Sequence, residues 1–253
     1  MSPPGRYAVV IAALVAMSAS GCTNSADSPT AEITVFAAAS LQKTFTQLGQ
    51  QFEAANPGTA VVFNFGGSSD LVAQLQQGAP GDLFASADAA TMDKAVDDAL
   101  ITGEPTVFAT NSMVIAVPPG NPAGIDSFAA LADPDVNVVV CAPQVPCGAA
   151  TQTIEENTGV TLSPVSEENS VTDVLGKVTS GEADAGIVYV TDVKGAGDAV
   201  EGIEIPTAVN ATNRYPIGVL AGSGSPDLAE EFEDFLLGPQ GQQVLADAGF
   251  GGP

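Results

Sequence analysis

The sequence has no histidine, no tryptophan and few basic residues, and each shortage narrows the range of possible functions. Histidine is the commonest general base and transition-metal ligand, so its absence argues against many classes of enzyme and metal site. Without tryptophan, a pocket that stacks sugars or cages amines is disfavoured. With 30 acidic residues against 6 basic ones, the chain cannot build a surface that neutralises nucleic-acid phosphates. We therefore expect no nucleic-acid partner and no cofactor.

The N-terminal segment is typical of an export signal. Arg6 is the only charge before the apolar stretch of residues 8–17, which is too short to span a bilayer. Ala19-Ser20-Gly21-Cys22 resembles a bacterial lipobox, in which the cysteine is lipidated. We predict a signal peptide over 1–21, lipidation of Cys22, a polar tether over 22–31, and attachment to the extracytoplasmic face of the cell membrane. Ordinary cleavage nearby, with a free Cys22 thiol, is the alternative.

Two further cysteines, Cys141 and Cys147, lie six residues apart. In an exported protein this pair indicates a disulfide. The chain-entropy model assigns so short a loop about 2–2.5 kcal/mol. Two thiols without histidine or a second pair make an incomplete zinc site, so we expect no metal site here.

Strand-like and helical patterns alternate along the chain. This rhythm predicts an α/β fold with mainly parallel sheets covered by helices. The final helical pattern is interrupted at Gly238-Pro239. The expected strands are 33–40 (ending in small residues at Ser40), 60–65, 82–85, 113–117, 136–140, 186–190 and 217–221, and the expected helices are 41–55, 71–75, 89–100, 127–131, 149–156 and 171–180.

Four expected helices begin with small or hydroxyl-bearing residues directly after strands: at Ser40, 66–70, 146–148 and 169–173. Ser170 and Asp173 have the spacing of a capping box. The first turn of a helix has free N–H groups and favours anions, as does the carboxyl edge of a parallel sheet. A plain N-cap explains any one of these serines. Together, with little basic charge nearby, they fit an oxyanion held by neutral dipoles.

Ser40 and Lys43 also satisfy the S-x-x-K pattern of serine–lysine hydrolases. The pattern is short, and neither a Lys-Thr-Gly segment nor a convincing Ser-x-Asn partner accompanies it. A hydrolase that uses Ser40 and Lys43 is therefore a remote alternative, and we expect a protein that is not an enzyme.

Six segments stand in a characteristic order and spacing: 36–41 (Phe-Ala-Ala-Ala-Ser-Leu), 67–69 (Gly-Ser-Ser), 78–88 (Gly-Ala-Pro-Gly-Asp-Leu-Phe-Ala-Ser-Ala-Asp), 186–189 (Gly-Ile-Val-Tyr), 215–216 (Tyr-Pro) and 238–240 (Gly-Pro-Gln). In the order and spacing of these segments, the chain resembles the periplasmic molybdate-binding proteins of ABC importers from about residue 32 to Phe250. The segment 78–88 is the most specific of the six.

The resemblance implies a two-lobed periplasmic-binding-protein fold of type II, with molybdate or tungstate bound between the lobes. It places residues 32–112 and 208–253 in lobe I and 113–207 in lobe II. It also implies a monomer that delivers the ion to an ABC permease. The implied ligand-binding residues are Ser40, Ser68, Cys147, Val171 and Tyr189. A receptor of the same fold for another oxyanion, such as sulfate, is the alternative.

The chain departs from the family pattern in three places. Gly66-Gly67 replaces a more serine-rich turn, which we expect to loosen that loop. Asp70 adds a carboxylate to the first turn of a helix, where a bound dianion would repel it. The Cys141–Cys147 pair would tether a binding loop, which we interpret as preorganisation of the site.

Overall fold

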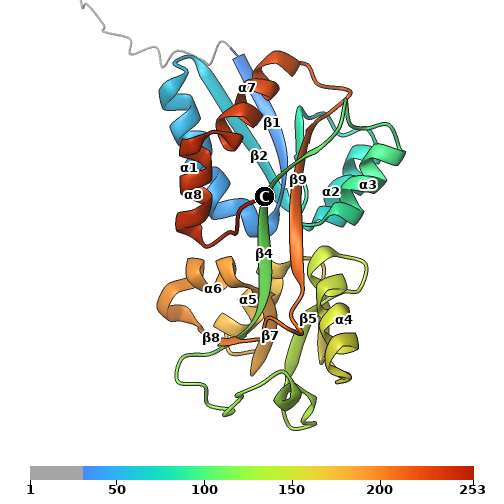
Figure 1. Ribbon diagram of the computed structural model, residues 1–253, viewed down its shortest axis with the longest axis vertical. Helices are drawn as coiled ribbons and strands as arrows, with labels where there is room; N and C mark the ends of the chain where they lie inside the picture. Colours follow the sequence, from blue (N-terminus) through green and yellow to red (C-terminus); the bar gives the residue numbers. More distant parts are fainter. Residues whose placement is uncertain (1–30) are drawn as a thin grey trace, which may run out of the picture.

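The computed structural model describes residues 31–253 (Figure 1). The predicted signal peptide and the predicted lipidation site, Cys22, lie outside the described residues. Of the predicted tether only Ala31 is described, and it begins strand β1. Among the described residues, no helix is both long and apolar enough to cross a membrane.

Nine strands form one sheet in the order β2-β1-β3-β9-β4-β7-β5-β6, and β8 pairs with β4 outside this path. The long strands β4 and β9 run through both halves of the molecule (Figure 1). The strands are β1 (Ala31–Ala38), β2 (Thr59–Gly66), β3 (Leu83–Ala85), β4 (Thr106–Val117), β5 (Val138–Cys141), β6 (Ser166–Glu168), β7 (Ala185–Tyr189), β8 (Glu201–Glu204) and β9 (Thr212–Val219).

Helices cover this sheet in both halves of the molecule (Figure 1). Short 3₁₀ turns cover Ala39–Leu41, Ala129–Ala132 and Gly197–Ala199. The α-helices are α1 (Gln42–Ala55), α2 (Ser68–Gln76), α3 (Ala89–Asp97), α4 (Pro146–Thr158), α5 (Val171–Thr179), α6 (Val190–Ala196), α7 (Pro226–Leu237) and α8 (Pro239–Ala248).

The α/β fold class is confirmed, but the strand pairings are more mixed than expected. β1 pairs in parallel with β2 and β3, and β5 pairs in parallel with β6 and β7. Every described pairing that involves β4 or β9 is antiparallel. These two strands carry the chain between the halves in opposite directions, which a local sequence pattern does not reveal.

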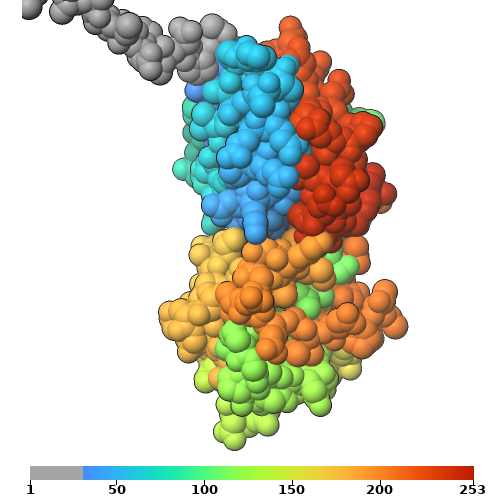
Figure 2. All heavy atoms as spheres, turned by 90° about the vertical axis from the view of Figure 1, so that its left-hand side faces the viewer, coloured from blue at the N-terminus to red at the C-terminus, as the bar shows by residue number. Residues whose placement is uncertain are grey.

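The buried apolar residues fall into separate clusters on the two sides of this crossing. One cluster contains residues from Met113 to Ala211 only. The others contain residues up to Ala109 and from Tyr215 onward. We call the part around the first cluster lobe II and the rest lobe I. The core of lobe II extends past the predicted boundary at 207/208, and the exact boundaries stay a prediction. Figure 2 shows a waist between the two lobes.

The segment 78–88 is a structural scaffold of lobe I. Asp82 is buried and accepts hydrogen bonds from Thr34 N (2.8 Å), Ser223 Oγ (2.6 Å) and Gly224 N (3.0 Å). It thereby ties β1 to the loop that follows β9. Asp88 caps α3 by accepting from Thr91 N (2.9 Å). The segment therefore has a structural role, because its two carboxylates hold together the part of lobe I on which the site is built.

Several expected elements differ in extent or type. The helix expected over 127–131 is a 3₁₀ turn, Ala129–Ala132. β6 and β8 were not expected, because Ser166–Glu168 and Glu201–Glu204 are polar segments with little apolar alternation. The helix break at Gly238-Pro239 is confirmed, with α7 ending before it and α8 beginning at Pro239.

Phe45 is the centre of the aromatic core of lobe I, fully buried between the rings of Phe63, Phe108 and Phe232. We expect Phe45→Ala to lower the free energy of unfolding by about 3–5 kcal/mol, because it leaves a cavity in this core. Denaturant unfolding measures the change. Val62→Ala, at a 45 % exposed position, is the control and should change stability by under about 0.5 kcal/mol. Equal effects of the two substitutions would contradict the packing argument.

Candidate anion-binding site

The five predicted ligand-binding residues line one small cavity between the lobes, with a volume of about 20 Å³. Lobe I contributes Ser40 and Ser68, and lobe II contributes Cys147, Val171 and Tyr189. None of the described residues that line the cavity is charged. Because a cavity needs roughly 10–15 Å³ on this measure to hold a water, there is room only for a small, compact group.

Three of these residues lie in the first turn of a helix. Ser68 is the first residue of α2, Val171 is the first of α5, and Cys147 is the second of α4. N–H groups at these positions have no acceptor within their own helix. The helix dipoles add positive potential at the same ends. The cavity therefore collects three helix N-termini from both lobes.

Each of the two serine hydroxyls that lobe I contributes has a hydrogen-bond partner within the same lobe. Ser68 is 2 % exposed, and its Oγ accepts a hydrogen bond from Ala87 N at 3.0 Å. Its own proton is thus free to be donated. Ser40 lies in the 3₁₀ turn before α1, and its Oγ pairs with the Tyr215 hydroxyl at 2.9 Å. Strand β9 thereby supports the serine from behind.

Tyr189 ends β7 and is 1 % exposed. Its hydroxyl oxygen accepts from Asn213 Nδ2 at 2.9 Å. Burial, together with the nearby hydroxyl of Tyr215 and the carboxylates of Asp192 and Asp88, raises the pKa of Tyr189 well above its usual value. The phenol therefore stays protonated and can act as a hydrogen-bond donor.

A disulfide joins Cys141, at the end of β5, to Cys147 in the first turn of α4. The loop between them is tightly folded: a Cβ on Gly148 would lie 1.9 Å from the Ala142 carbonyl oxygen. Only glycine fits at this close approach. The disulfide and Gly148 together fix the position of the Cys147 N–H.

The lobes touch directly beside the cavity. A Cβ on Gly67 would lie 2.1 Å from the Asn169 carbonyl oxygen of lobe II. Ser69 Oγ donates to the Gln144 carbonyl at 2.8 Å. Gly67 was expected to loosen its loop, but here it permits close contact between the lobes. Asp70 is exposed and does not line the cavity.

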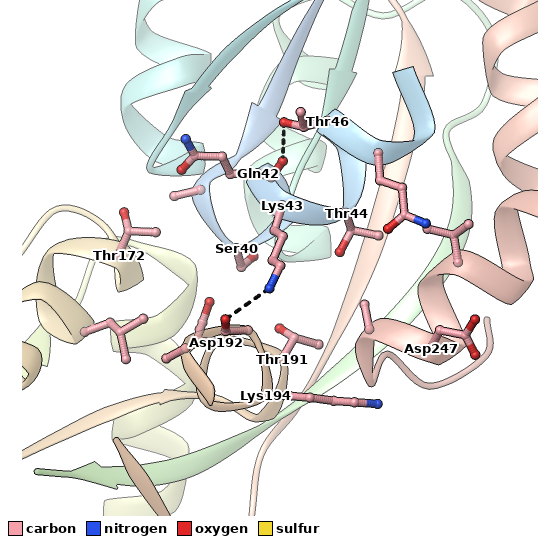
Figure 3. A pocket seen from close by; sticks show the side chains of 17 residues that line it. Ser40, Gln42, Lys43, Thr44, Thr46, Thr172, Thr191, Asp192, Lys194 and Asp247 are labelled. Atoms are coloured by element: carbon pink, nitrogen blue, oxygen red, sulfur yellow. Dashed lines mark hydrogen bonds between the residues drawn. The ribbon is translucent and has the colours of Figure 1, made fainter. Parts of the chain in front are cut away.

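A larger groove of about 670 Å³ adjoins the cavity and shares Ala39 and Ser40 with it (Figure 3). Lys43, Lys194 and Asp192 are among its lining residues. We assign the anion site to the smaller cavity, because it gathers all five predicted residues and the groove contains only Ser40.

Ser40 and Lys43 are not arranged as a nucleophile and its base. The Lys43 ammonium donates to the Gly195 carbonyl of lobe II at 3.2 Å, as the dashed line in Figure 3 shows. Ser40 pairs instead with Tyr215. The geometry offers no support for the serine–lysine alternative. Among the described residues, no group of three or more histidine, cysteine, aspartate or glutamate side chains could hold a metal ion.

The expected capping box at α5 is formed only in part. Ser170 accepts from Asp173 N at 3.3 Å, as predicted. The Asp173 carboxylate, however, accepts from the Ser170 hydroxyl at 2.6 Å, where a capping box would use the Ser170 backbone N–H.

Sequence reasoning missed two residues behind the site, Asn213 and Tyr215 of β9. They are two positions apart, so they lie on the same face of the strand. Tyr215 belongs to a segment used for the family resemblance but had no assigned role. The signal that could have found them is their alternation with the exposed Thr212 and Arg214, which places two hydrogen-bonding side chains on the inner face of the strand.

Comparison with known proteins gives related solute-binding proteins. Residues 33–251 match the family described as bacterial extracellular solute-binding protein. The molybdate-binding protein ModA of Mycobacterium tuberculosis is 50% identical over 97% of this chain and 95% of its own length. The periplasmic molybdate-binding protein of Azotobacter vinelandii has a TM-score of 0.77 at 24% identity, over 87% of this chain and 99% of that one. The sulfate-binding protein SubI of M. tuberculosis has a TM-score of 0.73 at 22% identity, over 87% and 86%.

The fold and the cavity between the lobes define a periplasmic binding protein of the α/β type. The chain belongs to the bacterial extracellular solute-binding proteins, in the group that contains the ModA proteins. These proteins are transport components that bind a solute as a ligand, and they are not enzymes.

Asp192 lies beside the site, 8 % exposed, and its Oδ2 accepts from Tyr189 N at 2.9 Å. Burial raises the pKa of its carboxyl from 3.8 to about 7, although the Tyr189 N–H opposes this. The folded protein therefore holds this proton more tightly than the unfolded chain. The stabilisation is present in full below about pH 4 and is lost as the pH rises to about 7.

We expect the free energy of unfolding to fall by a few kcal/mol between about pH 4 and pH 7 because of Asp192, and to level off above that range. Burial also raises the pKa of Glu233, which acts in the same direction, so the comparison must isolate Asp192. Asp192→Asn keeps an acceptor for Tyr189 and should flatten the slope in denaturant unfolding at several pH values. Asp70→Asn, on the exposed start of α2, should not. An unchanged slope in the Asp192 variant would refute the assignment.

Proposed function

We propose that this protein captures molybdate outside the cytoplasm and delivers it to an ABC permease. The observation that carries the proposal is the small, uncharged cavity in which hydroxyl and N–H donors of both lobes converge. The M. tuberculosis relative named a molybdate-binding protein supports the choice of ion.

The chemistry of the cavity fits a compact oxyanion. It is too small for a sugar, an amino acid or a peptide. Its donors are dipoles with no lysine or arginine among the lining residues, so binding depends on how many donors an ion reaches at once. A smaller ion that misses a donor leaves a polar group unpaired, which costs roughly 1–3 kcal/mol. Size thereby separates molybdate from sulfate.

In this proposal each predicted residue has a defined role. Ser40 and Ser68 donate through hydroxyl and N–H groups, and Tyr189 donates through its phenol. Cys147 and Val171 donate through their backbone N–H groups. Lobe I (32–112 and 208–253) and lobe II (113–207) close around the ion and present the closed shape to the permease.

Further parts of the proposal rest on the sequence. The lipobox-like segment supports a lipid anchor on Cys22 at the extracytoplasmic face of the membrane. Tungstate has the same tetrahedral form and would be bound by the same donors. We infer that the protein acts as a monomer, since its binding site is completed within one chain.

Sulfate is the second candidate ligand. The structural likeness to a sulfate-binding protein is a likeness of fold at 22% identity, and the identity to the molybdate-binding relative is higher. Calorimetry of the mature protein with molybdate, tungstate, sulfate and phosphate decides between these ligands. We expect molybdate to bind at least about a hundredfold more tightly than sulfate, a difference of about 2.7 kcal/mol. Equal affinity for sulfate would reject the molybdate assignment.

Ser68→Ala removes one buried donor and leaves the Ala87 N–H without its partner. We expect it to weaken molybdate binding about tenfold to a hundredfold, since a hydrogen bond to a charged group contributes about 1.5–3 kcal/mol. Ser180→Ala, on the exposed end of α5, is the matched control and should bind as the wild type does. If both variants kept wild-type affinity, Ser68 would not contact the ion.

Loss of the disulfide should loosen the Cys147 loop. We expect a Cys141→Ala/Cys147→Ala variant to lose about 2 kcal/mol of stability and to bind molybdate several-fold more weakly, because ordering the loop then opposes binding. Calorimetry and thermal denaturation measure the two effects. Treating the wild type with dithiothreitol should reproduce them, and the same treatment should leave the variant unchanged. Unaltered affinity after complete reduction would exclude a preorganising role.

A further inference from the structure

Asn213 lies on β9 where this strand passes between the lobes, and it joins three separate elements. Its Nδ2 lies 2.9 Å from the Tyr189 hydroxyl oxygen, 3.0 Å from the Ala87 carbonyl oxygen and 3.3 Å from the Pro146 carbonyl oxygen. Ala87 belongs to lobe I, whereas Pro146 and Tyr189 belong to lobe II. Asn213 itself does not line the cavity.

The orientation of the Asn213 amide follows from its two carbonyl partners. A backbone carbonyl can only accept a hydrogen bond, so the NH₂ group of the amide must face Ala87 and Pro146. The same NH₂ group then faces the Tyr189 hydroxyl. An amide NH₂ group has two protons for these three acceptors, so the contacts share them. Because the amide nitrogen does not accept a hydrogen bond, the Tyr189 hydroxyl can only accept at this contact and cannot donate to it.

This bond fixes the direction in which Tyr189 can donate. A phenol has a single proton, and that proton cannot point toward an N–H donor. It must turn toward the cavity or toward the neighbouring Tyr215 hydroxyl. A bond accepted from the amide also polarises the O–H group and strengthens its own donation. Asn213 thus excludes one direction of donation, and an ion in the cavity is one of the two acceptors left to the Tyr189 hydroxyl, beside Tyr215.

Through its other two bonds, Asn213 reaches the neighbours of two more site residues. Ala87 donates its N–H to Ser68 Oγ at 3.0 Å, so the Asn213 bond to the Ala87 carbonyl supports the peptide next to that contact. The Pro146 carbonyl and the Cys147 N–H belong to one peptide group, so the bond to Pro146 also fixes the peptide that carries the Cys147 N–H. The Asn213 amide in this way links the Tyr189 hydroxyl to the peptides next to the Ser68 contact and to Cys147, which belong to different lobes.

We propose that Asn213 is a positioning residue of the anion site, which holds the Tyr189 hydroxyl as a donor and couples the two lobes around the ion. The inference rests on the proposed function and deepens it. A cavity in which the Ser68 and Tyr189 hydroxyls both accept from N–H groups behind them, and so can donate forward, is suited to a ligand with acceptors only, that is, a fully deprotonated oxyanion. A protonated oxyanion would present its own O–H to a second donor.

A double-mutant cycle tests this role, with molybdate affinity measured by calorimetry for the wild type, Asn213→Leu, Tyr189→Phe and the double variant. We expect Asn213→Leu to weaken binding about tenfold to a hundredfold in the wild type, but only about threefold or less in the Tyr189→Phe background. Asn213→Ala gives the same cycle if the leucine variant does not fold. An equal factor in both backgrounds would show a general structural effect and overturn the inference.

Asn210→Leu is the matched control. Asn210 lies at the same crossing, where its Nδ2 donates to the carbonyls of Met113 (2.9 Å) and Ile205 (3.3 Å), and it does not line the cavity. We expect it to change affinity equally in both backgrounds. If it matched the coupling of Asn213→Leu, the crossing strands and not the Tyr189 hydroxyl would carry the effect, and the inference would fail.

The outcomes also separate this inference from the proposed function. A wild type that binds none of the four oxyanions would reject both. A wild type that binds molybdate, with Tyr189→Phe binding equally well, would leave the proposed function standing and overturn the role of Asn213.

Discussion

The direction of the hydrogen bonds behind the cavity is the constraint on which the site depends. Ser68 accepts from a backbone N–H, and Tyr189 accepts from an amide N–H. The Ser68 proton is therefore left for the cavity, and the Tyr189 proton is left for the cavity or for Tyr215. Reversing either bond would turn a donor into an acceptor, and an anion would then meet lone pairs. Strand β9 contributes the donor to Tyr189, and the segment that follows β3 contributes the donor to Ser68, so the sheet keeps both directions fixed.

Strand β9, which crosses between the lobes, supports two of the site's hydroxyl groups. It leaves lobe II, passes Asn213 and Tyr215 behind the cavity, and then enters the sheet of lobe I between β3 and β4. Because both side chains lie on one face, a single strand supports Tyr189 from one lobe and Ser40 from the other. The connection between the lobes is thus also part of the support of the site.

Much of the fold was predictable because its signals are local. The apolar alternation of β1, the stripe of α1 and the break at Gly238-Pro239 each depend on neighbouring residues. The full lengths of β4 and β9, and their antiparallel pairing, depend on partners far away in the sequence and were missed. The polar edge strands β6 and β8 were missed for the same reason, since only their partners make them strands.

The site residues likewise divide into those that have a local sequence signal and those that do not. The five predicted ligand-binding residues follow from helix starts and from the family resemblance, and all five are among the residues that line the cavity. The spacing of Asn213 and Tyr215 could have marked them as a pair on one face of a strand, but nothing in their local sequence states which hydroxyls they meet. The effect of Gly67 was misjudged, since the flexibility of a glycine is visible in the sequence but its contact with the Asn169 carbonyl is not.

Gly67 has a consequence for how such a protein can change over generations. A Cβ at this position would meet the Asn169 carbonyl of lobe II, so any side chain would stand as a wedge between the lobes. Because Gly67 also lines the cavity, the same substitution would alter its wall. The time for which an ion is retained and the choice of ion are in this way linked at one position.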